Sequence, residues 1–218
     1  MNLLKKITQI LTALAGLTGL TLLMVFNLRV VRVNLELTYL GSILRSFSFF
    51  TVLTNLLVLI SVTVPLFWPQ RRAGRFFFKP QILSGLLVYI VVVGLVYHVA
   101  LARIWNPRGV HKIADVIQHY LVPILFLLHW IFVPKGTLSW KVVPSWLVFP
   151  AVYFAFILVC GAITNVYPYP FVDVSQLGLL QVLINAVVIT LGFALVGLGV
   201  VALDKLLGKT RLNRQLQP

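Results

Sequence analysis

An acid and a base stand one helical turn apart near the start of an apolar stretch of the chain. Asp115 and His119 are four residues apart, so a helix places them on one face, and Pro123 follows after another four residues. A carboxylate in this position can orient or charge-stabilise an imidazole that acts as a general base. The alternative is that Asp115, close to the predicted start of its helix, serves as an N-terminal cap or dipole partner.

The composition indicates that this face lies inside a membrane protein. The 218 residues are 60% hydrophobic and 10% charged, whereas a soluble domain is about half apolar and about a quarter charged. An ionisable face within a membrane is costly in contact with lipid, so it has to point into the protein or toward water. Of the four acidic residues and four histidines in the chain, Asp115 and His119 are one each.

Hydropathy predicts the elements that position these residues. A membrane-spanning helix requires about 20 predominantly apolar residues. We predict an all-α, multi-pass protein in which residues 1–218 form a single domain, a bundle of six transmembrane helices. This domain ends in a basic cytoplasmic tail at residues 204–218. The predicted helices cover residues 7–26, 47–67, 81–102, 113–133, 145–164 and 177–203.

The distribution of Lys and Arg predicts the orientation. If the N-terminus is inside, twelve of these residues fall in inner regions and six in outer loops, so both termini are expected in the cytoplasm. The net charge of +14 then indicates contact of the basic loops with anionic lipid headgroups and not binding of nucleic acid. We expect no cofactor, because Cys160 is the only cysteine and no CxxC or Cys/His zinc spacing occurs.

Counting helical rises from the outer surface groups several polar residues at one depth. Thr51 lies about 6 Å, His98 about 7 Å and His119 about 9 Å below that surface. Asn55 continues the face of Thr51 inward, so we expect these residues and Asp115 to share one outer layer.

Other polar residues are assigned elsewhere or to the edge of this layer. Thr54 lies beside Asn55, and Arg103 marks the outer end of the third helix. His129 is expected near the inner surface, apart from His119, and His111 in a solvated outer loop.

The fifth loop, residues 166–173, adds aromatic residues to the same side. Tyr167, Tyr169 and Asp173 stand in it among prolines that stiffen the chain into an extended form. The loop is expected either to fold over the pocket as a lid or wall, or to be an ordinary aromatic loop at the membrane interface.

Several motifs, in order along nearly the whole chain, resemble those of the Pr6Pr family of six-helix bacterial membrane proteins. The most specific are Asp115-x3-His119-x3-Pro123 and Tyr167-Pro-Tyr169-Pro-Phe171; the others are Phe50-Thr51-Val-Leu-Thr54-Asn55, Leu101-Ala-Arg103-Ile-Trp105, Phe149-Pro150-Ala-Val-Tyr153 and Gly161. The resemblance implies a multi-pass protein of the bacterial inner membrane.

More distantly, the layout is similar to the androgen-induced-gene family of membrane hydrolases, which cleave fatty acid esters of hydroxy fatty acids with a threonine and a histidine. That resemblance implies Thr51 as the nucleophile and His119 as the base. The hydrolases place a polar residue three positions after the threonine, whereas Asn55 comes four after Thr51, so a shift of one residue would select Thr54 instead.

We therefore predict a hydrolase of lipid-like esters with Thr51 and His119 as catalytic residues in an outer-leaflet pocket. The substrate-binding residues are predicted to be Asn55, His98, Arg103, Asp115, Tyr167, Tyr169 and Asp173, with Asn55 or His98 as donors to the oxyanion. The partners are then membrane lipids and an amphiphilic ester substrate.

Two alternatives involve no ester chemistry. The first is a non-catalytic transporter or binding protein, with a polar pathway lined by His98, Arg103, Asp115 and His119. The second is haem ligation by His98 and His119.

Overall fold

The computed structural model describes the backbone of residues 3–215 and the side chains of residues 3–210, and this part of the chain is helical without strands. Three of the elements, η1 to η3, are single π-helical turns, and η4 and η5 are 3-10 turns. The elements in chain order are α1 (Leu3–Phe26), η1 (Asn27–Val31), α2 (Arg32–Asn34), α3 (Tyr39–Phe47), α4 (Phe50–Phe67), α5 (Arg72–Phe77), α6 (Pro80–Val96), η2 (Tyr97–Leu101), α7 (Gly109–Val116), η3 (Ile117–Leu121), α8 (Val122–Ile131), η4 (Trp140–Val142), α9 (Val143–Trp146), α10 (Val148–Thr164), η5 (Pro170–Val172) and α11 (Val174–Gln215).

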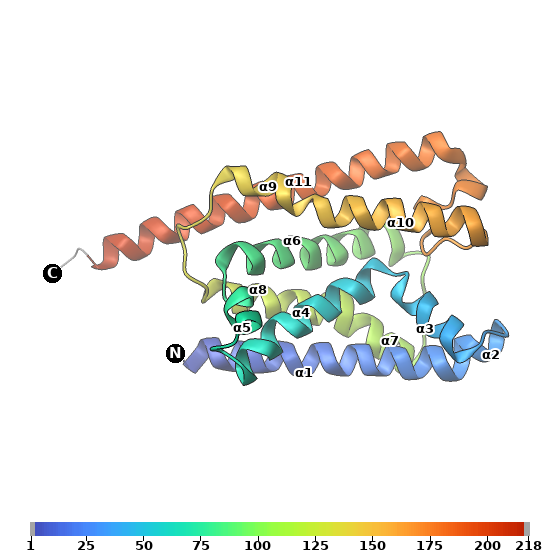
Figure 1. The fold of residues 1–218 in the computed structure, drawn as a ribbon, viewed down its shortest axis with the longest axis horizontal. Helices are drawn as coiled ribbons and strands as arrows, with labels where there is room; N and C mark the ends of the chain where they lie inside the picture. The colour runs from blue at the N-terminus through green and yellow to red at the C-terminus, as the bar shows by residue number, and fades with distance from the viewer. Residues whose placement is uncertain (1–2, 216–218) are drawn as a thin grey trace.

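Within the described residues, six helical stretches are long and apolar enough to cross a membrane. They are Leu3–Asn34, Phe50–Phe67, Pro80–Leu101, Gly109–Ile131, Trp140–Thr164 and Val174–Thr210. The prediction of an all-α chain with six such helices is confirmed. The helices run along the long axis of the molecule, with the start of α1 and the end of α11 at one end and the start of α4 at the other (Figure 1).

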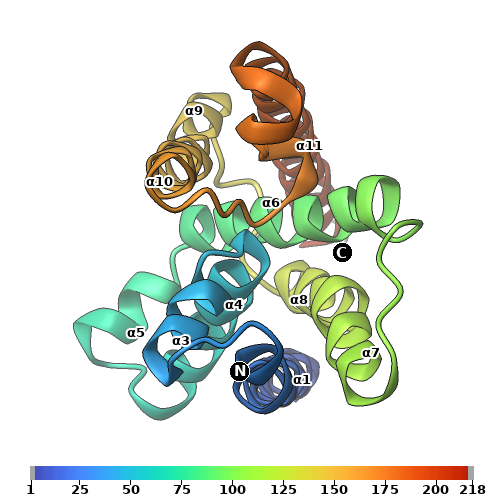
Figure 2. The ribbon, with the colours of Figure 1, turned by 90° about the vertical axis from the view of Figure 1, so that its right-hand side faces the viewer.

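Helix α6 forms the centre of the bundle. Ten of its 17 residues are buried, and it packs against α4, α8 and α11. Viewed from the end, α6 separates α1, α4, α7 and α8 on one side from α10 and α11 on the other (Figure 2). Large apolar side chains on the outward faces of α1, α10 and α11 remain exposed, as expected for helices that face lipid.

Small and polar residues hold α1 against α4 and η3. Gln9, Thr12, Gly16 and Gly19 are among the buried residues of α1, and small residues of this kind allow membrane helices to approach closely. The amide Nε2 of Gln118 in η3 donates to the carbonyl oxygen of Gly19 at 3.0 Å. These contacts fix the turn that also carries His119.

An aromatic cluster joins α4 to α6, α10 and α11. The ring of Phe50 lies 5.0 Å from Tyr153, 5.4 Å from Phe149, 5.7 Å from Phe193 and 6.3 Å from Tyr89, measured between ring centroids. Such tilted and edge-on arrangements stabilise aromatic pairs beyond the burial of their area. Because Phe50 is the first residue of α4, the cluster anchors the start of that helix.

The π-helical turn η3 ends just before Pro123. A proline lacks the N–H that would bond the carbonyl oxygen four residues earlier, and its ring crowds that carbonyl, so a wider turn before it relieves the clash. The carbonyl in question belongs to His119. It lies next to Gly94 of α6, where a Cβ atom would come within 2.8 Å of the His119 oxygen. The absence of a side chain at Gly94 therefore lets α6 and η3 approach closely beside His119.

Candidate active site

Thr51, His119 and Asp115 form a line of side chains at the end of the bundle where α4 begins. The hydroxyl oxygen Oγ1 of Thr51 lies 3.4 Å from Nε2 of His119. On the other side of the ring, Nδ1 lies 3.2 Å from Oδ1 of Asp115. The order hydroxyl, imidazole, carboxylate is that of a nucleophile, a general base and the acid that orients the base.

The neighbours of the His119 ring determine which nitrogen carries its hydrogen. Nδ1 faces the Asp115 carboxylate and also lies 2.9 Å from the backbone carbonyl oxygen of Asp115. Both groups are acceptors, so we assign the hydrogen to Nδ1 from these contacts. Nε2 is then left with its lone pair toward Thr51, which is the form that can accept the hydroxyl proton.

Asp115 is a partner of His119 and not a helix cap. Helix α7 begins at Gly109, four residues before the predicted start, so Asp115 is its seventh residue and Arg108 occupies the N-cap position. The second carboxylate oxygen of Asp115 accepts a hydrogen bond from the hydroxyl of Tyr97. The expectation of a cap is therefore wrong, and both oxygens are used to hold neighbouring side chains.

The side chain of Tyr97, which comes from a third helix, contacts both His119 and Asp115. Its ring stacks on the imidazole of His119 at a centroid distance of 3.9 Å and an interplanar angle of 17°, while its hydroxyl bonds Asp115. Tyr97 is the first residue of the π-helical turn η2, and His119 lies in η3. Two π-helical turns thus present their side chains to each other, as such turns often do at functional sites.

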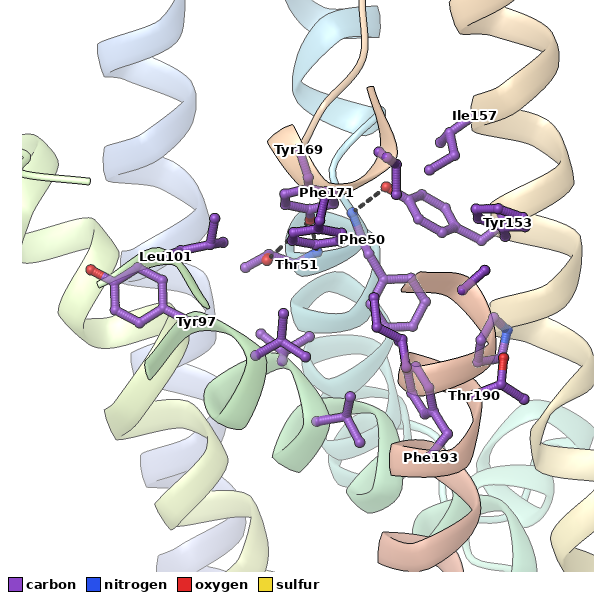
Figure 3. Close-up of a pocket in the computed structure, with 18 of the residues that line it drawn as sticks. Phe50, Thr51, Tyr97, Leu101, Tyr153, Ile157, Tyr169, Phe171, Thr190 and Phe193 are labelled. Carbon is purple, nitrogen blue, oxygen red and sulfur yellow. Dashed lines mark hydrogen bonds between the residues drawn. The ribbon is translucent and has the colours of Figure 1, made fainter. Parts of the chain in front are cut away.

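Two tyrosine hydroxyls meet the free backbone N–H groups at the start of α4. The N–H of Phe50 donates to the hydroxyl of Tyr153 at 3.1 Å, and the N–H of Thr51 donates to the hydroxyl of Tyr169 at 3.4 Å. The Tyr153 hydroxyl in turn donates to the carbonyl oxygen of Ser48 at 2.7 Å. The Tyr169 hydroxyl also lies 3.5 Å from Oγ1 of Thr51 (Figure 3). These contacts tie α10 and the fifth loop to the helix that carries Thr51.

Neighbouring aromatic rings hold Tyr169 in place. Its ring stacks on Phe171 at 5.1 Å with an interplanar angle of 6°, and it meets the edge of Phe49 at 5.6 Å. Burial raises the pKa of the Tyr169 hydroxyl above its ordinary value. The hydroxyl therefore keeps its proton at neutral pH and can act as a donor.

Two cavities meet at Thr51. The first, of about 210 Å³, is bounded by α6, α10 and α11 and is strongly apolar. Besides the residues that it shares with the second cavity, it is lined by Phe50, Val92, Val93, Val96, Pro150, Ala151, Tyr153, Phe154, Ile157, Phe171, Val172, Ala186, Ile189, Thr190 and Phe193. Figure 3 shows Phe193 and Thr190 at a distance from Thr51 along this cavity.

The second cavity, of about 380 Å³, lies between α1, α3, α7 and the fifth loop; its surface is also mostly apolar, but more polar side chains are among its lining residues. Arg45 is the only Lys or Arg among its lining residues, which also include Asn27, Ser42, His111 and Gln118. The two cavities share five lining residues, namely Thr51, Tyr97, Leu101, His119 and Tyr169. Thr51 and His119 therefore lie at the junction of the two cavities.

Asn55 and Thr54 lie deeper in α4, and neither is among the lining residues of the two cavities. The amide Nδ2 of Asn55 donates to the carbonyl oxygens of Thr51 at 2.9 Å and of Gln118 at 3.4 Å. Asn55 thus braces α4 against η3 behind the site. Thr54 is fully buried, and its hydroxyl has no hydrogen-bond partner within the described part of the chain. The geometry favours Thr51 over Thr54 as nucleophile.

His98 and Arg103 are exposed and line neither cavity. Nδ1 of His98 lies 3.2 Å from the hydroxyl of Tyr120. The imidazoles of His98 and His119 are thus turned to different partners. Of the polar layer expected from depth, the structure brings Thr51, Asp115 and His119 together and leaves His98 outside.

Tyr167 and Asp173 of the fifth loop also lie outside the cavity walls. The ring of Tyr167 packs directly on Gly161, where any side chain would collide with it. A carboxylate oxygen of Asp173 accepts from the backbone N–H of Ser175 at 3.0 Å, which caps the start of α11. Both residues fix the path of the loop, and Tyr169 alone of the three reaches Thr51.

The other two histidines differ from expectation in their burial. His111 is not in a solvated loop: it lies in α7, stacks on Phe26 at 4.2 Å and forms part of the second cavity wall. His129 is buried toward the opposite end of the bundle, with Nδ1 3.4 Å from Oγ1 of Thr8. His129 is therefore separate from the site, as predicted.

Three residues at the site were not found from the sequence. Tyr97 directly precedes His98 in the chain. The π-helical turn η2 directs Tyr97 toward His119, where His98 was expected, and leaves His98 exposed. Tyr153 was noticed only as part of the Phe149–Tyr153 motif, and Arg45 only as a topogenic charge.

Among the described residues, no group of three or more His, Cys, Asp or Glu side chains is arranged to hold a metal ion.

Comparison of the chain with known protein families, with curated proteins and with solved structures found no match. The function proposed below therefore rests on the membrane-spanning fold, the geometry at Thr51 and the motifs in the sequence.

Proposed function

We propose that the protein is a membrane-embedded hydrolase that cleaves lipid-like esters, with Thr51 as nucleophile and His119 as general base. The observation that carries this proposal is the alignment of Thr51, His119 and Asp115 where the two cavities meet. Oγ1 of Thr51 lies 3.4 Å from Nε2 of His119, within the looser range that such pairs show without substrate. The resemblance to the androgen-induced-gene hydrolases, which points to the same two residues, supports it.

Acylation begins when Thr51 attacks the ester carbonyl carbon and its hydroxyl proton passes to Nε2 of His119. The imidazolium that forms is stabilised by the Asp115 carboxylate at Nδ1. The tetrahedral intermediate then collapses, the bond from the carbonyl carbon to the alkoxy oxygen breaks, and His119 returns the proton to the departing alcohol. The acyl group is left as an ester of Thr51.

Deacylation uses water and the same base. A water molecule gives its proton to Nε2 of His119 as its oxygen attacks the acyl-Thr51 carbonyl. When the second tetrahedral intermediate collapses, the proton returns to Oγ1 of Thr51 and the carboxylic acid is released. Both halves of the cycle require the His119 tautomer that the Asp115 contacts select.

The two cavities match the two halves of an amphiphilic ester. The acyl chain fits the apolar cavity between α6, α10 and α11, where its burial removes apolar surface from water or headgroups. The alcohol portion then lies in the second cavity, whose lining residues include Arg45 and His111. An ester lying across the junction presents its carbonyl to Thr51.

The site belongs in the outer half of a bacterial cell membrane in this proposal. The start of α4, which carries Thr51, lies toward the end of the bundle opposite the start of α1 and the end of α11 (Figure 1). Twelve of the 18 Lys and Arg residues fall in the regions on the side of the termini if the predicted spans are used, which favours a cytoplasmic location for that side. The substrate then enters from the outer leaflet.

A fluorophosphonate probe and a panel of lipid esters test the proposal on isolated membranes. The wild type is expected to be labelled and to hydrolyse at least one ester. Thr51→Ala and His119→Ala are expected to lose labelling and turnover by several orders of magnitude, because removing either member disables the whole unit. Thr54→Ala is the matched control, since it removes a hydroxyl from the same helix away from both cavities, and it is expected to keep both activities.

Two results would contradict the proposal. One is a wild type that neither reacts with the probe nor turns over any ester of the panel. The other is labelling that persists in Thr51→Ala.

A further inference from the structure

The proposed reaction needs a donor for the negative charge that develops on the carbonyl oxygen. Such a donor has to lie about 2.7–3.1 Å from the position of the oxyanion. The oxyanion is bonded to the same carbon as Oγ1 of Thr51, so the donor has to be a close neighbour of Thr51. Asn55 gives its amide hydrogens to backbone carbonyl groups, and His98 lies outside the cavities. Neither of the two donors expected from the sequence is positioned for this role.

Tyr169 has the required position. Its hydroxyl oxygen lies 3.5 Å from Oγ1 of Thr51 and 3.4 Å from the backbone nitrogen of Thr51. It lines both cavities, so it stands beside the junction where the ester carbonyl of a substrate has to lie. Figure 3 shows the hydroxyl of Tyr169 directed toward Thr51.

The hydrogen-bond directions leave the Tyr169 proton available for this purpose. The Tyr169 oxygen accepts from the N–H of Thr51, so its own hydrogen points elsewhere, and the acceptors within reach are Oγ1 of Thr51 and the hydroxyl oxygen of Tyr153. The Tyr153 hydroxyl, bonded to the same helix start, differs because its proton is given to the carbonyl oxygen of Ser48. Of the two tyrosines, Tyr169 is therefore the one whose proton can reach the reacting group.

Formation of the tetrahedral intermediate changes which acceptor is better. Before attack, Oγ1 of Thr51 is a hydroxyl oxygen and accepts from Tyr169. After attack, Oγ1 is bonded to carbon and the charge resides on the former carbonyl oxygen. A donor that already faces this position gains a charge-assisted hydrogen bond in the transition state, and an interaction that is stronger there than in the ground state raises the rate.

The surroundings hold Tyr169 ready for this role. Stacking on Phe171 and the edge contact with Phe49 limit its movement, so little reorganisation is needed when charge develops. The start of α4 adds the positive end of a helix dipole on the same side. The N–H of Thr51 itself becomes a second donor when the oxyanion replaces the Tyr169 oxygen as its acceptor.

We propose that Tyr169 is a catalytic residue that donates its hydroxyl proton in a hydrogen bond to the oxyanion, together with the backbone N–H of Thr51. This inference rests on the proposed esterase function. It assigns to the fifth loop a direct part in the reaction.

Tyr169→Phe tests the inference, with Tyr167→Phe as the matched control from the same loop. The purified protein is assayed for ester turnover and its acylation step, for the rate at which the fluorophosphonate phosphonylates the nucleophile with loss of fluoride, and for the affinity of a trifluoromethyl ketone, which forms an anionic tetrahedral adduct with the nucleophile. For Tyr169→Phe we expect kcat/KM to fall about 10²- to 10³-fold, mostly through kcat. The ketone affinity is expected to fall by the same factor, because the adduct resembles the transition state. Tyr167→Phe keeps the ring that packs on Gly161 and is expected to match the wild type in every assay.

A folding defect is separated from a lost donor by a second protein with 3-fluorotyrosine at position 169. Its ring has nearly the same shape and its hydroxyl is more acidic, so acylation is expected to be at least as fast as in the wild type. Slower acylation in this protein would overturn the inference.

The outcomes distinguish this inference from the proposed function. If Thr51→Ala and His119→Ala lose labelling while Tyr169→Phe reacts like the wild type, the nucleophile and base stand and Tyr169 is not the donor. If turnover falls in Tyr169→Phe without a matching loss of ketone affinity, Tyr169 only positions the loop and the inference is wrong. A wild type without any labelling or turnover overturns both.

Discussion

Asp115→Asn removes the charge of the carboxylate while keeping its shape, and the structure indicates how large the effect should be. Oδ1 of Asp115 lies 3.2 Å from Nδ1 of His119 in an ion-pair contact, and Oδ2 accepts a hydrogen bond from the hydroxyl of Tyr97. An amide has one acceptor and one donor end, so in either orientation its NH₂ group faces one of these donors. The variant therefore loses either the hydrogen bond from Tyr97 or the ion-pair contact with Nδ1 of His119, and in both orientations it loses the attraction to the imidazolium that forms during acylation.

The expected loss in kcat/KM is roughly ten- to 150-fold. A hydrogen bond to a charged group contributes about 1.5–3 kcal/mol, and each 1.36 kcal/mol is about tenfold in rate. The loss should stay well below the roughly 10⁴-fold known for a triad in which the wrong tautomer forms. The reason is that the backbone carbonyl oxygen of Asp115, 2.9 Å from Nδ1 of His119, still accepts the hydrogen and preserves the tautomer.

The assay is ester turnover together with the rate of fluorophosphonate labelling in purified protein. Asp173→Asn is the matched control, because it makes the same chemical change at the cap of α11, away from both cavities, and Asn is also a good cap. A loss within about twofold for Asp115→Asn would refute the orienting role of the carboxylate. A loss as large as that of His119→Ala would refute the role of the backbone carbonyl.

Two further predictions concern stability. Gly94→Ala places a Cβ atom 2.8 Å from the carbonyl oxygen of His119, so α6 and η3 have to separate, and we expect the free energy of unfolding to fall by about 1–3 kcal/mol. Gly192→Ala, whose Cβ meets nothing within 4 Å, is the control for thermal unfolding in detergent, and equal melting temperatures for the two variants would contradict the close approach. Burial raises the pKa of the Tyr169 hydroxyl in the folded protein above the unfolded value of about 10. The contribution of the protonated hydroxyl to stability is therefore fully present below the unfolded pKa. It is lost as the pH rises toward the higher folded pKa. The melting temperature of the wild type should therefore fall more steeply than that of Tyr169→Phe between about pH 9 and 11, and parallel curves would show that the fold does not depend on that proton.

The membrane-spanning helices follow from hydropathy because each apolar run is long enough to cross a bilayer. The beginning of α7 was missed because residues 109–112 are largely polar and extend the helix beyond its apolar part. The short helix α3 was not predicted for a similar reason: it is amphipathic, lies between the first two spans and is too short to cross a membrane. Hydropathy detects the portion of a helix that needs lipid or core around it, and it does not detect a polar extension.

The site was partly predictable because depth along a helix is fixed by its rise. This reasoning grouped Thr51 with Asp115 and His119, which the structure brings together. The depth of a residue along its helix does not show, however, in which direction its side chain points. Neighbouring residues on a helix point about 100° apart. The π-helical turn η2 directs Tyr97 toward His119 and leaves His98 exposed, and no feature of the local sequence indicates that turn.

Helix α6 separates α10 and α11 from the other helices, as Figure 2 shows. The two parts of the chain contribute different residues to the proposed site. Thr51, Asp115 and His119 all come from the first four spans, whereas α10 and α11 supply much of the apolar cavity wall and none of these three residues. In the proposed hydrolase, substitutions of cavity residues in α10 and α11 other than Tyr153 are therefore expected to alter the length and shape of the acyl chain that fits, while Thr51, His119 and Tyr169 keep their places. If the proposed reaction holds, new substrate preferences can be selected in the last two spans without change to Thr51, Asp115 and His119 of the first four spans or to Tyr169 of the fifth loop.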